Sequence, residues 1–189
     1  MKNVVVLVSG SGSNLQRIID CIDNGEIQNA NVSLVVADRA CYALERAENH
    51  QISHQLIKRG KDFCENLENI LPENTDLIVL AGFLSILSQE FCEKYKGKII
   101  NIHPALLPKF GGKGMWGHHV HHAVIEAGEK ESGATVHYVT SGIDEGEIIL
   151  QGKVEIEDGD TPDSLAQKIH QVEYDIFPKA INKILNKYI

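Results

Sequence analysis

Two polar side chains at the end of an apolar segment have the chemistry of an acyl-transfer site. Asn101 and His103 stand two residues apart at the end of Ile99–His103, and Pro104 follows directly. Side chains two apart on a strand point to the same face, so an amide and an imidazole would project together. Such a pair can stabilise an oxyanion and move a proton, as a tetrahedral intermediate requires. The alternative is a buried pair that only satisfies nearby loop backbone.

A carboxylate in a later loop could complete this pair. Asp144 lies between Gly142 and Gly146, in a segment whose glycines allow unusual backbone angles. A carboxylate there could orient a histidine and stabilise its charged form. Asp is also common in turns that have no catalytic role, so this residue alone does not decide between the two interpretations.

A glycine-rich turn follows the first apolar run and indicates a site for an anion. In Gly10-Ser11-Gly12-Ser13-Asn14, backbone N–H groups at a helix start can bind phosphate, and glycine permits close approach. Leu15 stands where the third glycine of a dinucleotide-binding motif belongs, although Asp38 ends the next strand as a ribose-binding acid would. The alternative is a tight turn in which Ser13 or Asn14 caps the helix.

The histidine-rich segment His118–His122, followed by Glu126, has spacing that could bind zinc or nickel on one helix face. The H-E-x-x-H pattern is absent and no cysteine neighbours the segment, so we expect no metal site here. Solvated histidines, or histidines of a ligand-binding loop, are the preferred interpretation.

Alternating strands and helices must position these groups. Continuous apolar runs predict buried parallel strands, and helical spacing of apolar residues predicts the segments between them. The predicted strands are 4–8, 32–37, 52–57, 77–81 and 99–103, and the predicted helices are 15–22, 42–49, 63–71 and 84–95. Strands 135–139 and 148–156 follow, and then a helix from Thr161-Pro162 through Ile176.

This order predicts an α/β fold: a doubly wound, mostly parallel, Rossmann-like sheet with helices on both faces and an antiparallel element in the C-terminal part. We expect residues 1–189 to form one domain, because no linker, repeat or low-complexity segment divides them. The loop 104–117 contains two prolines and four glycines. A loop of this length in a compact domain is usually functional, so it is a candidate wall of the site.

Charge and hydropathy exclude several functions. The 18 Lys and Arg residues against 26 Asp and Glu give a formal charge of −8, which disfavours a broad contact with nucleic acid or an anionic membrane. The apolar run Val4–Val8 is too short for a signal peptide, and Leu77–Leu84 is too short to span a bilayer. The four cysteines form no C-x-x-C pair. We therefore expect a cytoplasmic protein with reduced thiols.

Four motifs, taken together and in order, resemble the phosphoribosylglycinamide formyltransferase family. They are V-S-G-S-G-S-N-L-Q at 8–16, L-A-G-F at 80–83, N-I-H-P-A-L-L-P at 101–108 and I-D-E-G at 143–146. The resemblance covers nearly all of the chain. It implies transfer of a formyl group from 10-formyltetrahydrofolate, as co-substrate, to the amine of 5'-phosphoribosylglycinamide in de novo purine biosynthesis.

The resemblance also implies roles for individual residues. Asn101, His103 and Asp144 would be catalytic: Asn101 and a protonated His103 would meet the oxyanion, and Asp144 would stabilise the imidazolium. The ribonucleotide would contact Gly12, Ser13, Asn14 and Glu173. The folate would contact Leu84, Ser85, Ile86, Leu87, Asn101 and Ile143.

This chain departs from the family pattern at the folate site. Ser85 stands where many relatives carry Arg, the loop 110–117 is longer than in short members, and either Arg59 or Lys61 could meet the glutamate tail of the folate. We expect no metal, no nucleic acid and no membrane partner, and either a monomer or a homodimer.

Other functions remain as alternatives. A formyltetrahydrofolate deformylase is expected to carry an additional N-terminal domain and to lack the Gly-Ser-Asn turn. A methionyl-tRNA formyltransferase is expected to carry an additional C-terminal domain and a basic face. A nucleotide-binding module would use the glycine-rich turn and Asp38 without chemistry, and a metal sensor would depend on His118–His122 alone.

Overall fold

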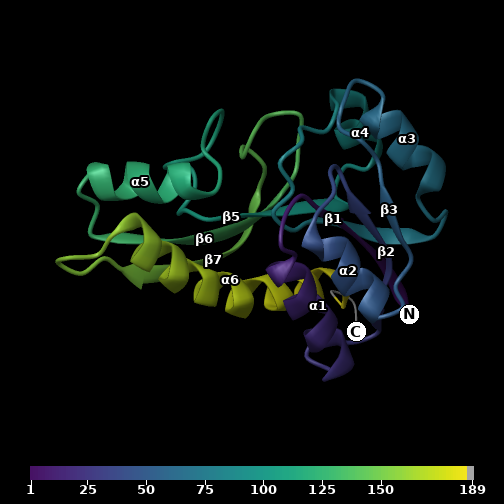
Figure 1. Cartoon of the computed structure of the whole chain (residues 1–189), viewed down its shortest axis with the longest axis horizontal. Coiled ribbons are helices and arrows are strands. Elements are labelled where there is room, and N and C mark those ends of the chain that lie inside the picture. Colours follow the sequence, from purple (N-terminus) through teal and green to yellow (C-terminus); the bar gives the residue numbers. More distant parts are fainter. Residues whose placement is uncertain (187–189) are drawn as a thin grey trace.

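A seven-stranded sheet forms the centre of the computed structural model, which describes residues 1–186. Its strands are β1 (Lys2–Val8), β2 (Ala30–Ala37), β3 (His54–Leu56), β4 (Thr75–Leu80), β5 (Ile99–His103), β6 (Glu131–Tyr138) and β7 (Ile148–Glu155). Their order across the sheet is β3-β2-β1-β4-β5-β6-β7. β1 to β5 run parallel, whereas β6 and β7 are antiparallel to their neighbours (Figure 1). The predicted mostly parallel sheet with an antiparallel C-terminal part is confirmed; the expected domain of residues 1–189 extends beyond the described residues.

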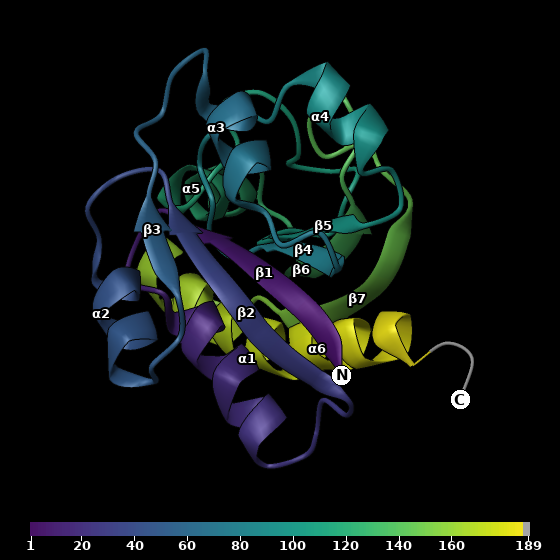
Figure 2. The same ribbon diagram turned by 90° about the vertical axis from the view of Figure 1, so that its right-hand side faces the viewer.

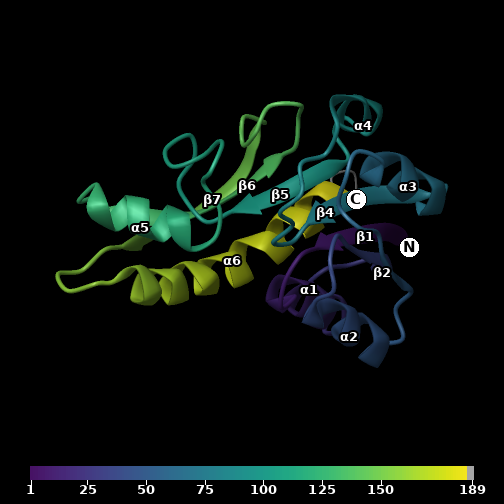
Figure 3. The same ribbon diagram turned by 45° about the horizontal axis from the view of Figure 1, so that its top comes forward.

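Helices cover both faces of this sheet. They are α1 (Ser13–Asp23), α2 (Tyr42–Asn49), α3 (Phe63–Ile70), α4 (Gln89–Lys94), α5 (His118–Glu126) and α6 (Pro162–Leu185). α1, α2 and α6 lie on one side of the strands, with α3 and α4 on the other (Figure 2). α5 runs beside α6 near the antiparallel strands (Figure 3). No described helix is both long enough and apolar enough to cross a membrane.

The central strands are apolar throughout because both of their faces are buried. In β1, Val4, Val6 and Val8 belong to the core shared with α1 and α6. Val5 and Leu7 belong to the core shared with α3 and α4. The sheet is therefore packed between two apolar layers, and polar residues follow at the ends of its strands, where the loops begin.

The prediction of a helix over 84–95 is wrong in its first part. Only Gln89–Lys94 is helical, and Ser88 caps it by accepting a hydrogen bond from the Phe91 N–H at 3.2 Å. Before that cap, the Leu84 N–H donates to Ser9 Oγ at 2.8 Å, and Ser85 Oγ bonds to Asp38 at 2.5 Å. These contacts with distant strand ends hold 84–88 in an irregular conformation, and local helical spacing cannot reveal them.

The start of α6 follows the sequence prediction. Thr161 accepts a hydrogen bond from the Ser164 N–H, Ser164 Oγ accepts one from the Thr161 N–H, and Pro162 occupies the first turn. Such a reciprocal cap satisfies backbone donors that a helix start otherwise leaves without partners. The result is a long, well-anchored helix that places His170 and Glu173 in the lining of the cavity described below.

Candidate active site

One cavity of about 740 Å³ opens at the carboxyl ends of β1, β4 and β5. In open α/β sheets, ligands bind at this edge. The loop 104–117, predicted to be a wall of the site, contributes Gly112 to Gly117 to the lining. The cavity brings together every residue predicted for the site: Gly12, Ser13, Asn14, Leu84, Ser85, Ile86, Leu87, Asn101, His103, Ile143, Asp144 and Glu173.

His103 is the last residue of β5, and both of its ring nitrogens face hydrogen-bond acceptors. Nε2 lies 2.7 Å from the Phe110 carbonyl, and Nδ1 lies 3.5 Å from Asp144 Oδ2. Asp144 has a positive φ of 58° in its glycine-flanked loop, and its Oδ2 also accepts the Gly112 N–H at 3.0 Å. Each ring nitrogen thus has an acceptor beside it, so a doubly protonated, charged imidazole could direct one N–H to the Phe110 carbonyl and the other to Asp144.

Burial opposes that charge. Burial lowers the pKa of His103 below 6.5, while the Asp144 charge and the Phe110 carbonyl act in the opposite direction without overcoming it. Burial also acts to raise the pKa of Asp144, but His137, His103 and the Gly112 N–H hold it below its usual value. At neutral pH the site thus contains a carboxylate and a neutral His103. The protonated His103 expected at the oxyanion stage of the reaction stays a prediction.

A further histidine, His137, joins Asn101 to Asp144. Asn101 and His137 are partners across the antiparallel β5 and β6 strands, with Asn101 Nδ2 3.2 Å from His137 Nε2. The same Nε2 lies 3.6 Å from Asp144 Oδ1, and Nδ1 lies 2.9 Å from the Tyr138 carbonyl. With Nδ1 donating to that carbonyl, Nε2 of a neutral His137 accepts from Asn101, and a protonated His137 would form an ion pair with Asp144.

The sequence prediction missed His137. It lies in a strand 36 positions from Asn101, where it has the pattern of an ordinary alternating strand residue. Only the register of β5 against β6 places it beside the catalytic candidates. The sequence predicted an antiparallel element in the C-terminal part, but not which strands pair in it or in what register, and the pairing partner of Asn101 was the signal that could have found His137.

The glycine-rich turn forms one end of the cavity. Gly12, with φ of 73°, precedes α1 as its N-cap, and no side chain caps the helix. The alternative in which Ser13 or Asn14 caps the helix is therefore wrong, because both residues lie inside the first turn. Because no side chain accepts a capping hydrogen bond at the helix start, its backbone N–H groups stay available to an anion.

Asn14 instead binds Glu173 from α6. Asn14 Nδ2 donates to Glu173 Oε2 at 3.0 Å, and His170 Nδ1 lies 3.1 Å from the same oxygen. Oε1 of Glu173 takes part in neither contact. Asn14 Oδ1 is enclosed and has no hydrogen-bond partner among the described residues. This end of the cavity thus presents a carboxylate oxygen and backbone N–H groups, which suit a phosphorylated sugar.

The end of the cavity away from the glycine-rich turn is largely apolar. Leu84 and Ile86 are 45% and 73% exposed, and Ile143 is 38% exposed in the facing loop. Below them Asp38 is buried and held by Arg39 through two contacts of 2.8 and 2.7 Å, in addition to Ser85. Both oxygens of Asp38 are therefore engaged, so it is not free to bind a ribose. Apolar side chains with nearby backbone groups suit a flat heterocycle.

The histidine-rich segment forms the start of α5 and divides into two environments. His118 and His122 are exposed, and His118 Nδ1 lies 3.5 Å from Asp163. His119 stacks edge-on against Trp116, whereas His121 is buried and lines the cavity. Among residues 1–186, no group of three or more His, Cys, Asp or Glu side chains is arranged to hold a metal ion.

Comparisons with known proteins agree with this geometry. Residues 2–181 match the family described as formyl transferase. The phosphoribosylglycinamide formyltransferase of Haemophilus influenzae is 40% identical over 189 residues, covering 96% of this chain and 86% of that protein. The trifunctional purine biosynthetic protein adenosine-3 of Drosophila melanogaster is 42% identical over 98% of this chain, which spans only 14% of that relative. The crystal structure of phosphoribosylglycinamide formyltransferase from Anaplasma phagocytophilum superimposes with a TM-score of 0.89 at 35% identity, covering 98% of this chain and 88% of that one.

Proposed function

Because the chain belongs to the formyl transferase family, we propose that it transfers the formyl group of 10-formyltetrahydrofolate to the amine of 5'-phosphoribosylglycinamide. One observation carries the proposal: Asn101, His103 and Asp144 lie together in one cavity. The glycine-rich turn, which could bind phosphate, lies at one end of this cavity, and the apolar pocket around Leu84 and Ile143 lies at the other. The product is formylglycinamide ribonucleotide, an intermediate of purine biosynthesis, and we place the reaction in the cytoplasm.

The two ends of the cavity set the proposed orientation of the substrates. Gly12, Ser13 and Asn14 would bind the phosphate through backbone N–H groups, and Glu173 would accept hydrogen bonds from the ribose hydroxyls through its Oε1 atom. Leu84, Ser85, Ile86, Leu87 and Ile143 would enclose the pterin ring of the folate. This arrangement directs the glycine amine and the formyl group toward Asn101 and His103 from opposite sides.

In the proposed reaction, the amine lone pair forms a bond to the formyl carbon, and the carbonyl π electrons move to its oxygen. The Asn101 amide donates one N–H to His137, which leaves the second N–H for the developing oxyanion. Neutral His103 takes up the proton that the amine loses, because Asp144 and the Phe110 carbonyl then face the two N–H groups of the imidazolium. Collapse of the intermediate breaks the bond to N10, which receives that proton.

This chemistry uses 10-formyltetrahydrofolate as a co-substrate, and we assign it no metal ion. The Asn101 N–H can stabilise the oxyanion by a hydrogen bond and the nearby imidazolium by its charge, and an imidazole with a carboxylate can move the proton. The alternative function, binding of a nucleotide without catalysis, is less well supported. It would need Asp38 to bind the ribose, but both carboxylate oxygens of Asp38 already bond to Arg39 or Ser85.

The decisive experiment follows the absorbance of a 10-formyl folate with purified protein, with and without 5'-phosphoribosylglycinamide, and detects the formylated nucleotide by mass. We expect turnover only when the nucleotide is present. Release of formate without the nucleotide would mean a deformylase. Absence of any turnover, together with tight dinucleotide binding, would favour the binding module.

We further propose that Arg59, rather than Lys61, meets the glutamate tail of the folate. Arg59 lines the cavity on the side of the apolar pocket, and Lys61 is not among the residues that line it. Arg59→Ala is expected to raise the KM for the folate by about tenfold, as loss of a charged hydrogen-bond partner does, whereas Lys61→Ala is expected to leave it unchanged. An effect of Lys61→Ala alone would reverse the assignment.

A further inference from the structure

The proposed reaction gives no role to the histidine-rich segment 118–122, yet one of these histidines lies at the site. His121 is 6% exposed and lines the cavity, while His118, His119 and His122 are exposed to solvent. Its neighbours Val120 and Val124 are buried in the core, which fixes the orientation of α5. The helix therefore places His121, and none of the three exposed histidines, against the cavity with little freedom to move.

The His121 side chain lacks a hydrogen-bond partner. Its Nδ1 atom is enclosed and bonds to none of the described residues. Burial, and then the neighbouring His118, lower the pKa of His121, so the ring is neutral at pH 7. A buried N–H without an acceptor is costly, which favours the tautomer with its proton on Nε2. His121 thus retains an N–H donor for a ligand.

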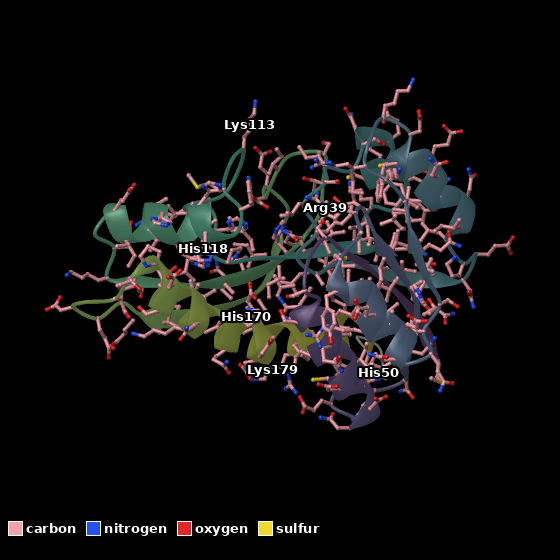
Figure 4. All side chains as sticks on the ribbon, viewed as in Figure 1. Arg39, His50, Lys113, His118, His170 and Lys179 are labelled. Carbon is pink, nitrogen blue, oxygen red and sulfur yellow. The ribbon has the colours of Figure 1, made fainter. Side chains whose placement is uncertain are left out.

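The surroundings of His121 identify the end of the cavity to which it belongs. The charged and titratable groups that act on it are His118 and His122 on its own helix, Glu173 on α6 and His103 on β5. Glu173 is tied to Asn14 of the glycine-rich turn. Figure 4 shows His118 on α5 and His170 on α6, the two helices that border this region. His121 therefore lines the cavity where α5 and α6 meet, near Glu173.

We propose that His121 donates a hydrogen bond from Nε2 to a sugar or phosphate oxygen of the ribonucleotide. This inference rests on the proposed function for the identity of the ligand. Glu173 can only accept hydrogen bonds from the sugar, so a neutral imidazole donor supplies the complementary half of the recognition. His121 is a substrate-binding residue in this scheme and takes no part in the proton transfer.

Two substitutions at His121 test the contact, with matched controls at the exposed His122. His121→Phe keeps a ring in the buried position but removes the donor, and His121→Gln restores an N–H near the position of Nε2. We expect His121→Phe to raise the KM for 5'-phosphoribosylglycinamide about tenfold, with the KM for the folate changed less than about twofold. His121→Gln should recover part of the loss, and His122→Phe and His122→Gln should match the wild type.

Calorimetric binding of ribose 5-phosphate to the same five proteins separates this inference from the proposed function. Wild-type protein should bind it more tightly than His121→Phe, whether or not formyl transfer occurs. Unchanged binding and KM in a folded His121→Phe protein would overturn the contact. An equal rise in both KM values would also overturn it, because the residue would then only shape the cavity. Absence of formyl transfer by the wild type would overturn the proposed function alone.

Discussion

Asp144 is the residue on which the proposed catalytic cluster depends. Its two oxygens lie near His103 and His137, and its backbone position is defined by a positive φ of 58°. Its lowered pKa means that it stays ionised at neutral pH. A fixed negative charge beside a neutral imidazole favours proton uptake by that imidazole during the reaction, which is the role proposed for His103.

Removal of either partner of this pair should slow the chemical step. We expect His103→Ala and Asp144→Ala each to lower kcat by roughly 10²-fold or more, because general acid–base groups typically contribute this much. The KM for the folate should change little, since neither side chain belongs to the apolar pocket. Steady-state rates with both substrates varied provide the measurement. A wild-type kcat in either variant would remove that residue from the mechanism.

His137 should act as a positioning residue through Asn101 and Asp144. His137→Phe removes both contacts of Nε2 and should lower kcat about tenfold, the effect of one lost hydrogen bond, with both KM values nearly unchanged. His137→Gln, which can still bond to Asn101, should recover part of the rate. The pH profile of kcat should also shift in His137→Phe, because Asp144 loses a partner that lowers its pKa. Equal rates for the Phe and Gln variants, with an unshifted profile, would indicate a purely structural role.

At the scale of the elements, the sequence correctly predicts those helices and strands whose bounds depend on the local spacing of apolar residues. β5 and α2 have the predicted bounds, because apolar runs and helical periodicity are local signals. The segment 84–88 was predicted wrongly, because Ser9 and Asp38 hold it from strand ends that are distant in sequence. His137 was missed for the same reason. Local patterns therefore located the strands and turns that carry the site, and long-range contacts determined the rest.

The turn before α1 has a steric requirement that a substitution can test. Gly12 has a φ of 73°, and a Cβ there would lie 2.6 Å from the Ala43 Cβ atom. Gly12→Ala should therefore lower the free energy of unfolding by about 2 kcal/mol or more, since both the backbone angle and the contact are unfavourable. The KM for the ribonucleotide should also rise, because the turn that binds its phosphate must shift.

Gly10 in the same turn provides the control. A Cβ at Gly10 would meet nothing within 4 Å. Gly10→Ala should change the unfolding free energy by less than about 0.5 kcal/mol, as substitutions without steric conflict usually do. Urea denaturation of the two variants makes the comparison. Equal stability of both would mean that the backbone at Gly12 can relax away from Ala43.

At the scale of the whole molecule, an acidic protein is proposed to bind two anionic substrates. The formal charge is −8, so attraction must come from local groups. Arg39, Arg59 and Lys113 line the cavity, and Lys113 stands at the tip of the loop before α5 (Figure 4). Because Arg39 is paired with Asp38, the positive potential at this edge of the sheet comes from Arg59, Lys113 and the N-terminus of α1.

The same cavity should make the stability of the molecule depend on pH. Burial lowers the pKa values of His103 and His121 below 6.5, so the unfolded chain binds protons at a higher pH than the folded protein. The free energy of unfolding therefore rises as pH increases from the folded pKa values to about 6.5, and then levels off. Asp38 and Asp144 have lowered pKa values, so their contribution is present above their usual pKa near 4 and is lost as pH falls further.

Thermal melting measured between pH 5 and 7.5 should show a melting temperature that rises with pH. His121→Phe should flatten that rise because it removes one of the two buried histidines, whereas substitution of the exposed histidine, His122→Phe, should not. A wild-type melting temperature that decreases as pH rises from 5 to 6.5 would contradict the neutral, buried state of both rings.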